Sequence, residues 1–123
     1  MVNVIVIDKE MFKLDYIEKL QTMFAEDEID ASSLHQYYAL GALVKDYCSK
    51  PWIESNKEYG KNRGKQVYYF SMEFLIGRLL NSNLVNLGIK DICEDALNDL
   101  GISLKKIEDI ESDAGLGNGG LGR

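Results

Sequence analysis

The 123-residue chain is predicted to be mainly α-helical, with one or two short β-strands. Two observations carry this prediction. Apolar residues recur at three- and four-residue steps along most of the chain, and only one run, residues 66–71, concentrates β-branched and aromatic residues. The contents of 46% hydrophobic and 28% charged residues are those of an ordinary globular chain of about one domain.

The first predicted helix runs from about Lys9 to Phe24, directly after Asp8. The acidic residues 26–30 that follow it are expected to form a connector. The predicted buried face of this helix comprises Met11, Phe12, Ile17, Leu20, Met23 and Phe24.

A second helix is predicted to begin at Ser32 or Ser33, and Ser33 would form a capping box with Gln36. Pro51 is expected to end this helix or to start another short helical piece. The glycines and charges of residues 60–64 then predict a turn. The apolar stripe of the second helix comprises Tyr37, Leu40, Val44 and Tyr47.

Residues 66–71 are predicted to form a strand, and their near-continuous apolarity predicts burial on both faces. One strand cannot satisfy its own backbone hydrogen bonds. Its partners must therefore come from the N-terminal apolar run, from a second copy or from sequence that this chain lacks. We expect the chain to be truncated, and to self-associate in isolation through this apolar surface.

Three short helices are predicted to follow. A leucine stripe over residues 75–87 is closed by Gly88. A second stripe over residues 92–100 is closed by Gly101, and Ser103 can cap a third helix.

Charge and cysteine content exclude several classes of function. The net charge of −6 argues against a nucleic-acid partner. The chain has neither a secretory signal pattern nor an apolar stretch of the ~20 residues that span a bilayer, so we expect a cytoplasmic protein without a membrane partner. Cys48 and Cys93 form no CxxC pair, so they predict two buried free thiols rather than a metal site.

Two further groups of residues have a structural and a functional interpretation. Six cations between Lys45 and Lys65 could hold a regulatory phosphate or nucleotide, but a solvated surface is the more common reason for such a run. The sole histidine, His35, is expected to have a surface role rather than a catalytic one.

The densest feature of the sequence is its glycine-rich end, where five glycines lie between Gly115 and Gly122. The run favours a shaped loop over a flexible tail. The backbone amides of Gly119, Gly120 and Leu121 could form an anion site at the start of a helix beyond Arg123. Two registers match G-x-G-x-x-G, but no strand precedes them, so a dinucleotide site is a weak interpretation.

Glu73 is the only acid in the predicted strand-to-helix passage over residues 67–80. It could hydrogen-bond a ligand at the carboxyl end of a strand, or it could stabilise a helix N-terminus. Arg78 could pair with Glu73 or hold a phosphate, and an ion pair is the simpler interpretation.

Residues 67–78 (VYYFSMEFLIGR) and 113–123 (DAGLGNGGLGR) together resemble the N-terminal region of the α-glucan phosphorylases, which include the glycogen, starch and maltodextrin phosphorylases. The segment 83–88 between them fits the same pattern, and the resemblance covers about residues 30–123. Accordingly, residues 1–30 are interpreted as an N-terminal helix with its connector. Residues 31–123 are interpreted as an incomplete part of the phosphorylase N-terminal domain.

The resemblance implies a function. The family transfers a glucosyl unit between an α-1,4-glucan and inorganic phosphate, giving glucose 1-phosphate, and the phosphate of pyridoxal phosphate acts as an acid-base group. By resemblance, Asn118, Gly119, Gly120 and Leu121 would face the glucosyl or phosphate groups in the catalytic cleft, and Glu73 would lie in the same cleft in a supporting role.

The family fold has two Rossmann-like domains facing a cleft, the GT-B arrangement of glycosyltransferases, and this chain would supply part of the first domain. The lysine that forms the Schiff base belongs to the distal part of a longer chain. This fragment is therefore expected to bind no pyridoxal phosphate and to be inactive. The full enzyme is expected to bind glucan and phosphate and to form a homo-oligomer. An ungapped comparison places Gly60 where AMP-activated animal enzymes carry an adenine-stacking tyrosine, which predicts no such activation.

The alternative hypothesis is a self-standing helical interaction or regulatory module that is related to phosphorylases without their reaction. A nucleotide-binding protein is a third and weaker hypothesis.

Overall fold

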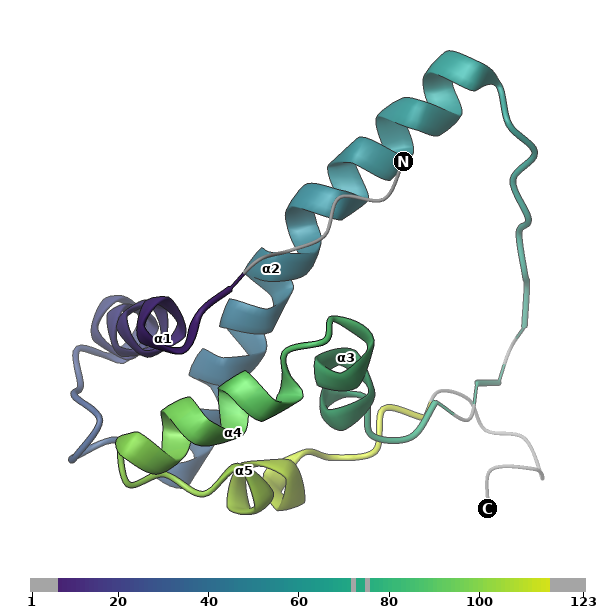
Figure 1. Cartoon of the computed structure of the whole chain (residues 1–123). Helices are drawn as coiled ribbons and strands as arrows, with labels where there is room; N and C mark the ends of the chain where they lie inside the picture. The colour runs from purple at the N-terminus through teal and green to yellow at the C-terminus, as the bar shows by residue number, and fades with distance from the viewer. Residues whose placement is uncertain (1–6, 72, 75, 116–123) are drawn as a thin grey trace.

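The computed structural model describes residues 7–71, 73–74 and 76–115. These residues form five helices and an isolated β-bridge at Phe74, but no regular strand. The prediction of a mainly helical chain is therefore confirmed (Figure 1). In chain order the helices are α1 (Lys9–Phe24), α2 (Ser33–Asn62), α3 (Leu80–Asn86), α4 (Lys90–Asp99) and α5 (Leu104–Ile110).

Helix α1 has the predicted bounds. The Asp8 side chain caps it by accepting a hydrogen bond from the backbone N–H of Met11 at 2.7 Å. Its fully buried residues are Phe12, Tyr16 and Leu20. The sequence stripe missed Tyr16 and wrongly included Met11 and Met23, which are 39% and 43% exposed. The missed tyrosine is tolerated inside because its hydroxyl donates to the backbone carbonyl of Gln36 at 3.1 Å.

Ser32, and not Ser33, caps α2, because its hydroxyl accepts from the backbone N–H of His35 at 3.2 Å. The predicted capping box of Ser33 and Gln36 is therefore wrong. Gln36 instead donates from its side-chain amide to the carbonyl of Ala31 at 3.3 Å.

Pro51 does not end α2, which continues as one 30-residue helix to Asn62. The expected break and separate short helix are thus wrong, and Gly60 is still helical. Proline removes only one helical hydrogen bond, the one to the carbonyl of Tyr47, and the helix continues through Pro51. The predicted turn is confined to the end of the segment, where Arg63 takes a left-handed conformation with φ 50°.

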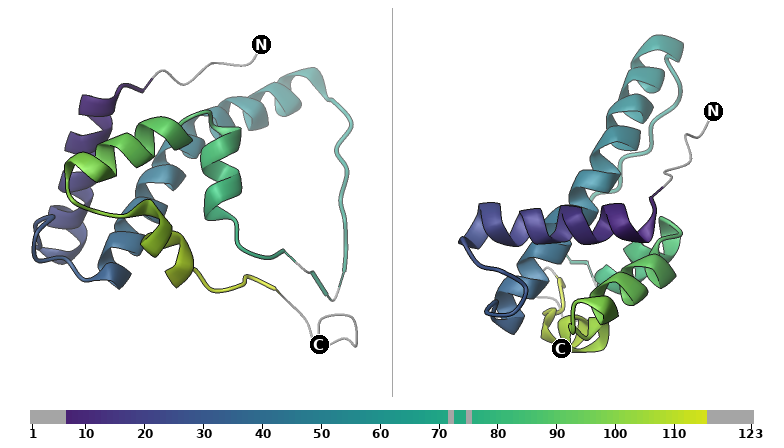
Figure 2. Two further views of the ribbon diagram at one scale, coloured as in Figure 1. Left: turned by 60° about the horizontal axis from the view of Figure 1, so that its bottom comes forward. Right: turned by 60° about the vertical axis from the view of Figure 1, so that its left-hand side comes forward.

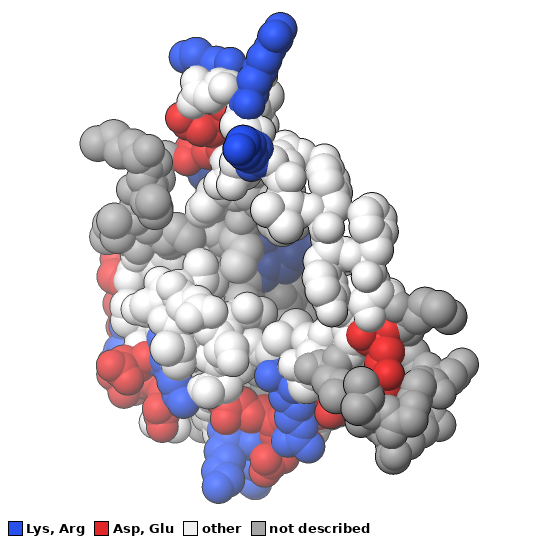
Figure 3. All heavy atoms as spheres, turned by 90° about the vertical axis from the view of Figure 1, so that its right-hand side faces the viewer, with Lys and Arg blue, Asp and Glu red and all other residues white. Residues whose placement is uncertain are grey.

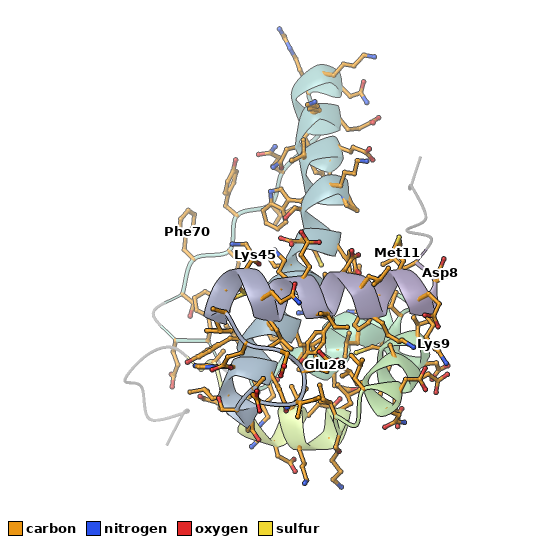
Figure 4. All side chains as sticks on the ribbon, turned by 90° about the vertical axis from the view of Figure 1, so that its left-hand side faces the viewer. Asp8, Lys9, Met11, Glu28, Lys45 and Phe70 are labelled. Carbon is orange, nitrogen blue, oxygen red and sulfur yellow. The ribbon has the colours of Figure 1, made fainter. Side chains whose placement is uncertain are left out.

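The predicted strand at residues 66–71 is wrong for this structure. The segment carries no regular secondary structure and is exposed throughout, with Val67 at 94% and Phe70 at 89%. It descends from the end of α2 at a distance from the other helices (Figure 1), and Phe70 points away from the helical body (Figure 4). No described segment offers it a neighbouring strand, so β-propensity alone does not produce a ladder. Residues 1–6, the other strand candidate, lie outside the described residues.

The residues predicted to end or cap the three short helices do so. Gly88 and Gly101 take positive φ values of 73° and 76° after α3 and α4, which is the conformation that favours glycine at a helix end. Ser103 caps α5 by accepting from the backbone N–H of Lys106 at 3.4 Å. Helix α3, however, begins at Leu80, later than the leucine stripe predicted.

The core lies where α1 packs on both α2 and α4, with α5 against α2 and α4 (Figure 2). Its members are almost all aliphatic or aromatic. Cys93 is fully buried, and burial raises the pKa of its thiol to about 12, whereas Cys48 is only half-buried, contrary to expectation. The largest fully buried side chains are Phe12, Tyr16, Leu20, Leu40, Leu84, Ile89, Leu97 and Ile107.

Lys9 and Lys13 join α1 to the end of α4 through the carboxylate of Asp99, at 2.7 and 3.2 Å. These contacts are exposed, so they fix geometry more than they add stability. Among the described helices, none is long and apolar enough to cross a membrane.

Candidate functional site

Glu111 is the only charged residue among the buried side chains of the described core, with 8% exposure. One of its carboxylate oxygens accepts from the backbone N–H of Leu79 at 2.7 Å, and both accept from that of Leu80, at 3.1 and 3.2 Å. These amides open α3, which has no cap from its own N-cap residue. Glu111 therefore caps a helix that begins 31 residues earlier in the sequence, where a negative charge also suits the helix dipole.

A second hydrogen bond joins the same two segments three residues further along. The backbone N–H of Ala114 donates to the carbonyl of Gly77 at 3.1 Å. Gly77 has a φ of +75°, a conformation that side chains rarely adopt, so glycine is required for this turn. The N–H of Gly115 in turn donates to the Asp113 side chain at 3.0 Å. Residues 73–80 and 111–115 thus lie side by side, as the views of Figure 2 also show.

Glu73 lies in this paired region and is half-buried. It is not at a helix N-terminus, because α3 begins only at Leu80, so that interpretation of Glu73 is wrong and Glu111 has the capping role instead. A local turn fixes the Glu73 backbone: its N–H donates to the Ser71 hydroxyl at 3.1 Å, and that hydroxyl donates to the Glu73 carbonyl at 2.7 Å. Across the described residues no ion pair joins Glu73 to Arg78, which is exposed.

The predicted ligand-binding residues Asn118, Gly119, Gly120 and Leu121 lie outside the described residues. What the structure describes is the approach to them: Asp113, Ala114 and Gly115 are tied to the segment that carries Glu73. The described parts of the two motifs that prompted the family resemblance are therefore adjacent in space, although 34 residues separate the motifs in the sequence.

An apolar groove of about 640 Å³ opens next to this region, between α2 and the start of α3. Trp52 and Ile53, which are 70% and 52% exposed, stand on its α2 side. Figure 3 shows this hollow with a mostly uncharged rim and basic atoms deep inside it, and Lys45 is a basic residue in its lining. Glu111 is also among the residues that line the groove.

The other predicted candidates have structural explanations. His35 stacks on Phe24, with ring centroids 4.0 Å apart, and its Nδ1 lies 2.9 Å from the Glu26 carboxylate, so it links the connector to α2. The six cations from Lys45 to Lys65 are all exposed, which is in keeping with a solvated surface. No cluster of potential metal ligands occurs in the part of the chain that the structure describes.

Sequence reasoning did not single out Glu111. It appeared only as one more acid after a short helix, and nothing local distinguishes it from Glu108 or Asp109. Its role depends on a contact with residues 79 and 80, and such distant pairs leave no trace in the periodicity of one sequence.

Comparison with known proteins shows which proteins this chain is similar to. No family model matches it. It is 48% identical over 115 residues to a glycogen phosphorylase of Bacillus subtilis (strain 168), a match covering 94% of this chain and 14% of that protein. It is 41% identical over 117 residues to a glycogen phosphorylase of Chlamydia trachomatis, covering 95% and 14%. It is 39% identical over 111 residues to the liver form of human glycogen phosphorylase, covering 90% and 13%.

The chain therefore spans about one seventh of the length of the relatives it matches. Identity of 39–48% over at least nine-tenths of the chain defines its class as that of the glucan phosphorylases. The chain is similar over at least nine-tenths of its length to glycogen phosphorylases, and it corresponds to the N-terminal region of these longer proteins.

Proposed function

We propose that this chain serves as the N-terminal segment of an enzyme that transfers glucosyl units from an α-1,4-glucan to inorganic phosphate, releasing glucose 1-phosphate. The observation that supports this most is the pairing of residues 73–80 with residues 111–115. It brings Glu73 beside the approach to the glycine-rich segment.

In this proposal the backbone amides of Gly119, Gly120 and Leu121, with Asn118 beside them, face the glucosyl or phosphate groups. Backbone amides suit this role because they present partial positive charge at a fixed position and need no side chain. Glu73 supports the same site as a hydrogen-bond acceptor for a sugar hydroxyl or for a neighbouring protein group. Residues 31–123 then form part of one domain of the longer two-domain enzyme.

Pyridoxal phosphate is the cofactor that resemblance to this family implies for the full enzyme. Two of the described lysines, Lys9 and Lys13, do not fit its attachment. A lysine that forms an imine must lose its proton, whereas Lys9 and Lys13 have a raised pKa because their hydrogen bonds to Asp99 favour the charged form. By resemblance to the family, the cofactor lysine is assigned to the part of the enzyme beyond this segment, and no step of the reaction is assigned to the cofactor.

We further propose that the full enzyme is a cytoplasmic homo-oligomer that binds neither nucleic acid nor membranes. Gly60 lies on an exposed turn of α2 with open space around its Cα. An aromatic ring that could stack on adenine is absent at this position, and we expect AMP to leave the activity of the full enzyme unchanged.

The test of the proposed function is the release of glucose 1-phosphate from maltoheptaose and inorganic phosphate by the full-length protein that carries this segment. Phosphate-dependent release is expected, and this 123-residue chain alone should give none.

In the full-length protein, Glu73→Gln should lower kcat/KM by about tenfold, which is the effect of losing one charge-assisted hydrogen bond. Glu94→Gln, an equal change at an exposed position on α4, is the control. Absence of release by the unmodified full-length protein would favour a helical interaction module instead.

A further inference from the structure

The contacts of Glu111 extend beyond the capping of α3. Its own backbone N–H donates to the carbonyl of Glu108 at 3.3 Å, so Glu111 also terminates α5. One residue thus closes α5 through its backbone and opens α3 through its side chain. These two helices are held at a fixed separation at the point where the chain turns toward the glycine-rich segment.

A backbone hydrogen bond from Ala114 joins the same two segments a second time, and a local turn at Asp113 supports it. Ala114 donates to Gly77 at 3.1 Å, and Asp113 accepts from Gly115 at 3.0 Å. If the Glu111 carboxylate were absent, the N–H groups of Leu79 and Leu80 would lose their acceptor, and that of Leu80 is buried. A buried donor without a partner is unfavourable, so the start of α3 would move to find one. Such a movement would carry Gly77 with it and loosen its bond to Ala114.

We propose that Glu111 is a positioning residue, whose carboxylate locks residues 77–80 against residues 111–114 and so sets the direction in which the chain enters the glycine-rich segment. The inference rests on the proposed function, because it is the glucosyl and phosphate site in that segment that Glu111 would position. Glu111 itself touches no substrate in this account and acts through the backbone.

The first test measures backbone amide hydrogen exchange, by NMR, in this 123-residue chain. Glu111→Gln keeps one acceptor oxygen but loses the charge and the second oxygen. Asp109→Asn makes the same charge change two residues away, at an exposed position. We expect the amides of Leu79, Leu80 and Ala114 to exchange about tenfold faster in Glu111→Gln and to be unchanged in Asp109→Asn. Acceleration confined to Leu79 and Leu80 would reduce Glu111 to a simple helix cap and overturn the proposal.

A second variant breaks the contact between Ala114 and Gly77 and tests whether the contacts of Glu111 weaken in response. Ala114→Pro removes the N–H that binds the Gly77 carbonyl but leaves Glu111 in place. Because coupling between two contacts is reciprocal, the amide of Leu80 should also exchange faster in this variant. Unchanged exchange at Leu80 would show that the two contacts are independent, which contradicts the proposed lock. If Glu111→Gln does not fold, this result decides the question.

The second test uses the full-length enzyme and separates binding from loss of folded protein. Positioning predicts that Glu111→Gln raises the KM for inorganic phosphate about tenfold more than Asp109→Asn does, with a smaller change in kcat. A fall in kcat with unchanged KM would indicate fewer folded molecules and would contradict positioning. If the unmodified full-length protein releases no glucose 1-phosphate, the proposed function fails, and the exchange experiments still decide the role of Glu111 in the fold.

Discussion

Single residues that satisfy buried or terminal backbone groups control this structure more than its exposed charges do. Asp8, Ser32 and Ser103 cap three helices locally, and each could be predicted because it lies next to the helix that it caps. Glu111 performs the same function for α3 from a distant position, and it could not be predicted in that way. The chemistry is the same in both cases, and only the sequence separation differs.

Ser32→Ala should lower the free energy of unfolding by about 1 kcal/mol, because the N–H of His35 would lose its acceptor. Ser33→Ala is the matched control, since Ser33 lies one residue later, is exposed and forms the first residue of α2. Urea unfolding followed by circular dichroism measures both. Equal losses in the two variants would show that the cap is not at Ser32.

The buried ionisable side chains predict a loss of stability at alkaline pH. Burial raises the pKa of the Cys93 thiol from 9.0 to about 12, and it also raises the pKa of Tyr16 and Tyr47 above the ordinary value of 10.0. Above pH 9 the unfolded chain therefore releases protons that the folded chain retains, and the free energy of unfolding falls as pH rises. For Cys93 the slope approaches about 1.4 kcal/mol per pH unit and ends near its folded pKa.

Cys93→Ala isolates the thiol contribution between pH 9 and pH 10, because the tyrosines, which begin to ionise in the unfolded chain in this range, are the same in both proteins. The variant is expected to be less stable at pH 7, because it leaves a small cavity, but its stability should vary less with pH in that range. Chemical denaturation at several pH values measures the slope. An unchanged slope would show that Cys93 ionises equally in the folded and unfolded chain.

At the scale of the elements, the helices whose signals are local were predicted well and the segments that depend on distant partners were not. Helix α1 was predicted with its observed bounds, and the glycines after α3 and α4 take the expected left-handed conformation. Pro51 was misjudged because a proline removes only one helical hydrogen bond and α2 continues on both sides of it. Residues 66–71 were misjudged because a strand needs a neighbouring strand, whatever its own composition.

The role of the candidate site residues stays a prediction. Glu73 was singled out from its position between apolar residues, and its segment lies beside residues 113–115. Its alternative role at a helix N-terminus was wrong, because α3 starts later than the leucine spacing suggests. The remaining predicted residues, 118–121, stay a prediction.

Pro51→Ala should strengthen the outer part of α2. Residues 52–62 are exposed and gain nothing from core packing, so their helicity depends on backbone hydrogen bonds and propensity. Replacing proline by alanine in a helix interior is worth up to about 3 kcal/mol. We expect stronger ellipticity at 222 nm and slower amide exchange in residues 52–55, with little change in Lys50→Ala. Unchanged exchange would show that Pro51 imposes no strain on α2.

Phe70→Ser should weaken self-association of the isolated chain. Residues 67–70 expose four large apolar side chains on an extended backbone with unpaired edges, which favours pairing with a second copy. Removing one of them should raise the dimer dissociation constant by about tenfold. Sedimentation equilibrium measures the constant. Ile29→Ser, at a position in the acidic connector that is 84% exposed, is the control. An unmodified chain that stays monomeric at high concentration would contradict the prediction.

At the scale of the whole molecule, the structure has a packed half and an open half. The packed half holds α1, α4, α5 and the first part of α2, and it contains the described core. The open half presents the outer part of α2, the apolar groove and residues 64–71, and Figure 3 shows a mostly uncharged surface around the groove with charged side chains above it. This division accords with a segment that spans 14% of its relatives and whose proposed site requires the remainder of the enzyme.

The most direct test of this account is the activity of a chimaera. This chain would replace the matching N-terminal segment of the Bacillus subtilis glycogen phosphorylase, to which it is 48% identical. The measurement is the rate of glucose 1-phosphate release from maltoheptaose and inorganic phosphate. If the chain is a working phosphorylase segment, the chimaera should retain activity within about tenfold of the parent enzyme, and Glu73→Gln within it should lower that activity. A folded chimaera without phosphorolysis would contradict the account.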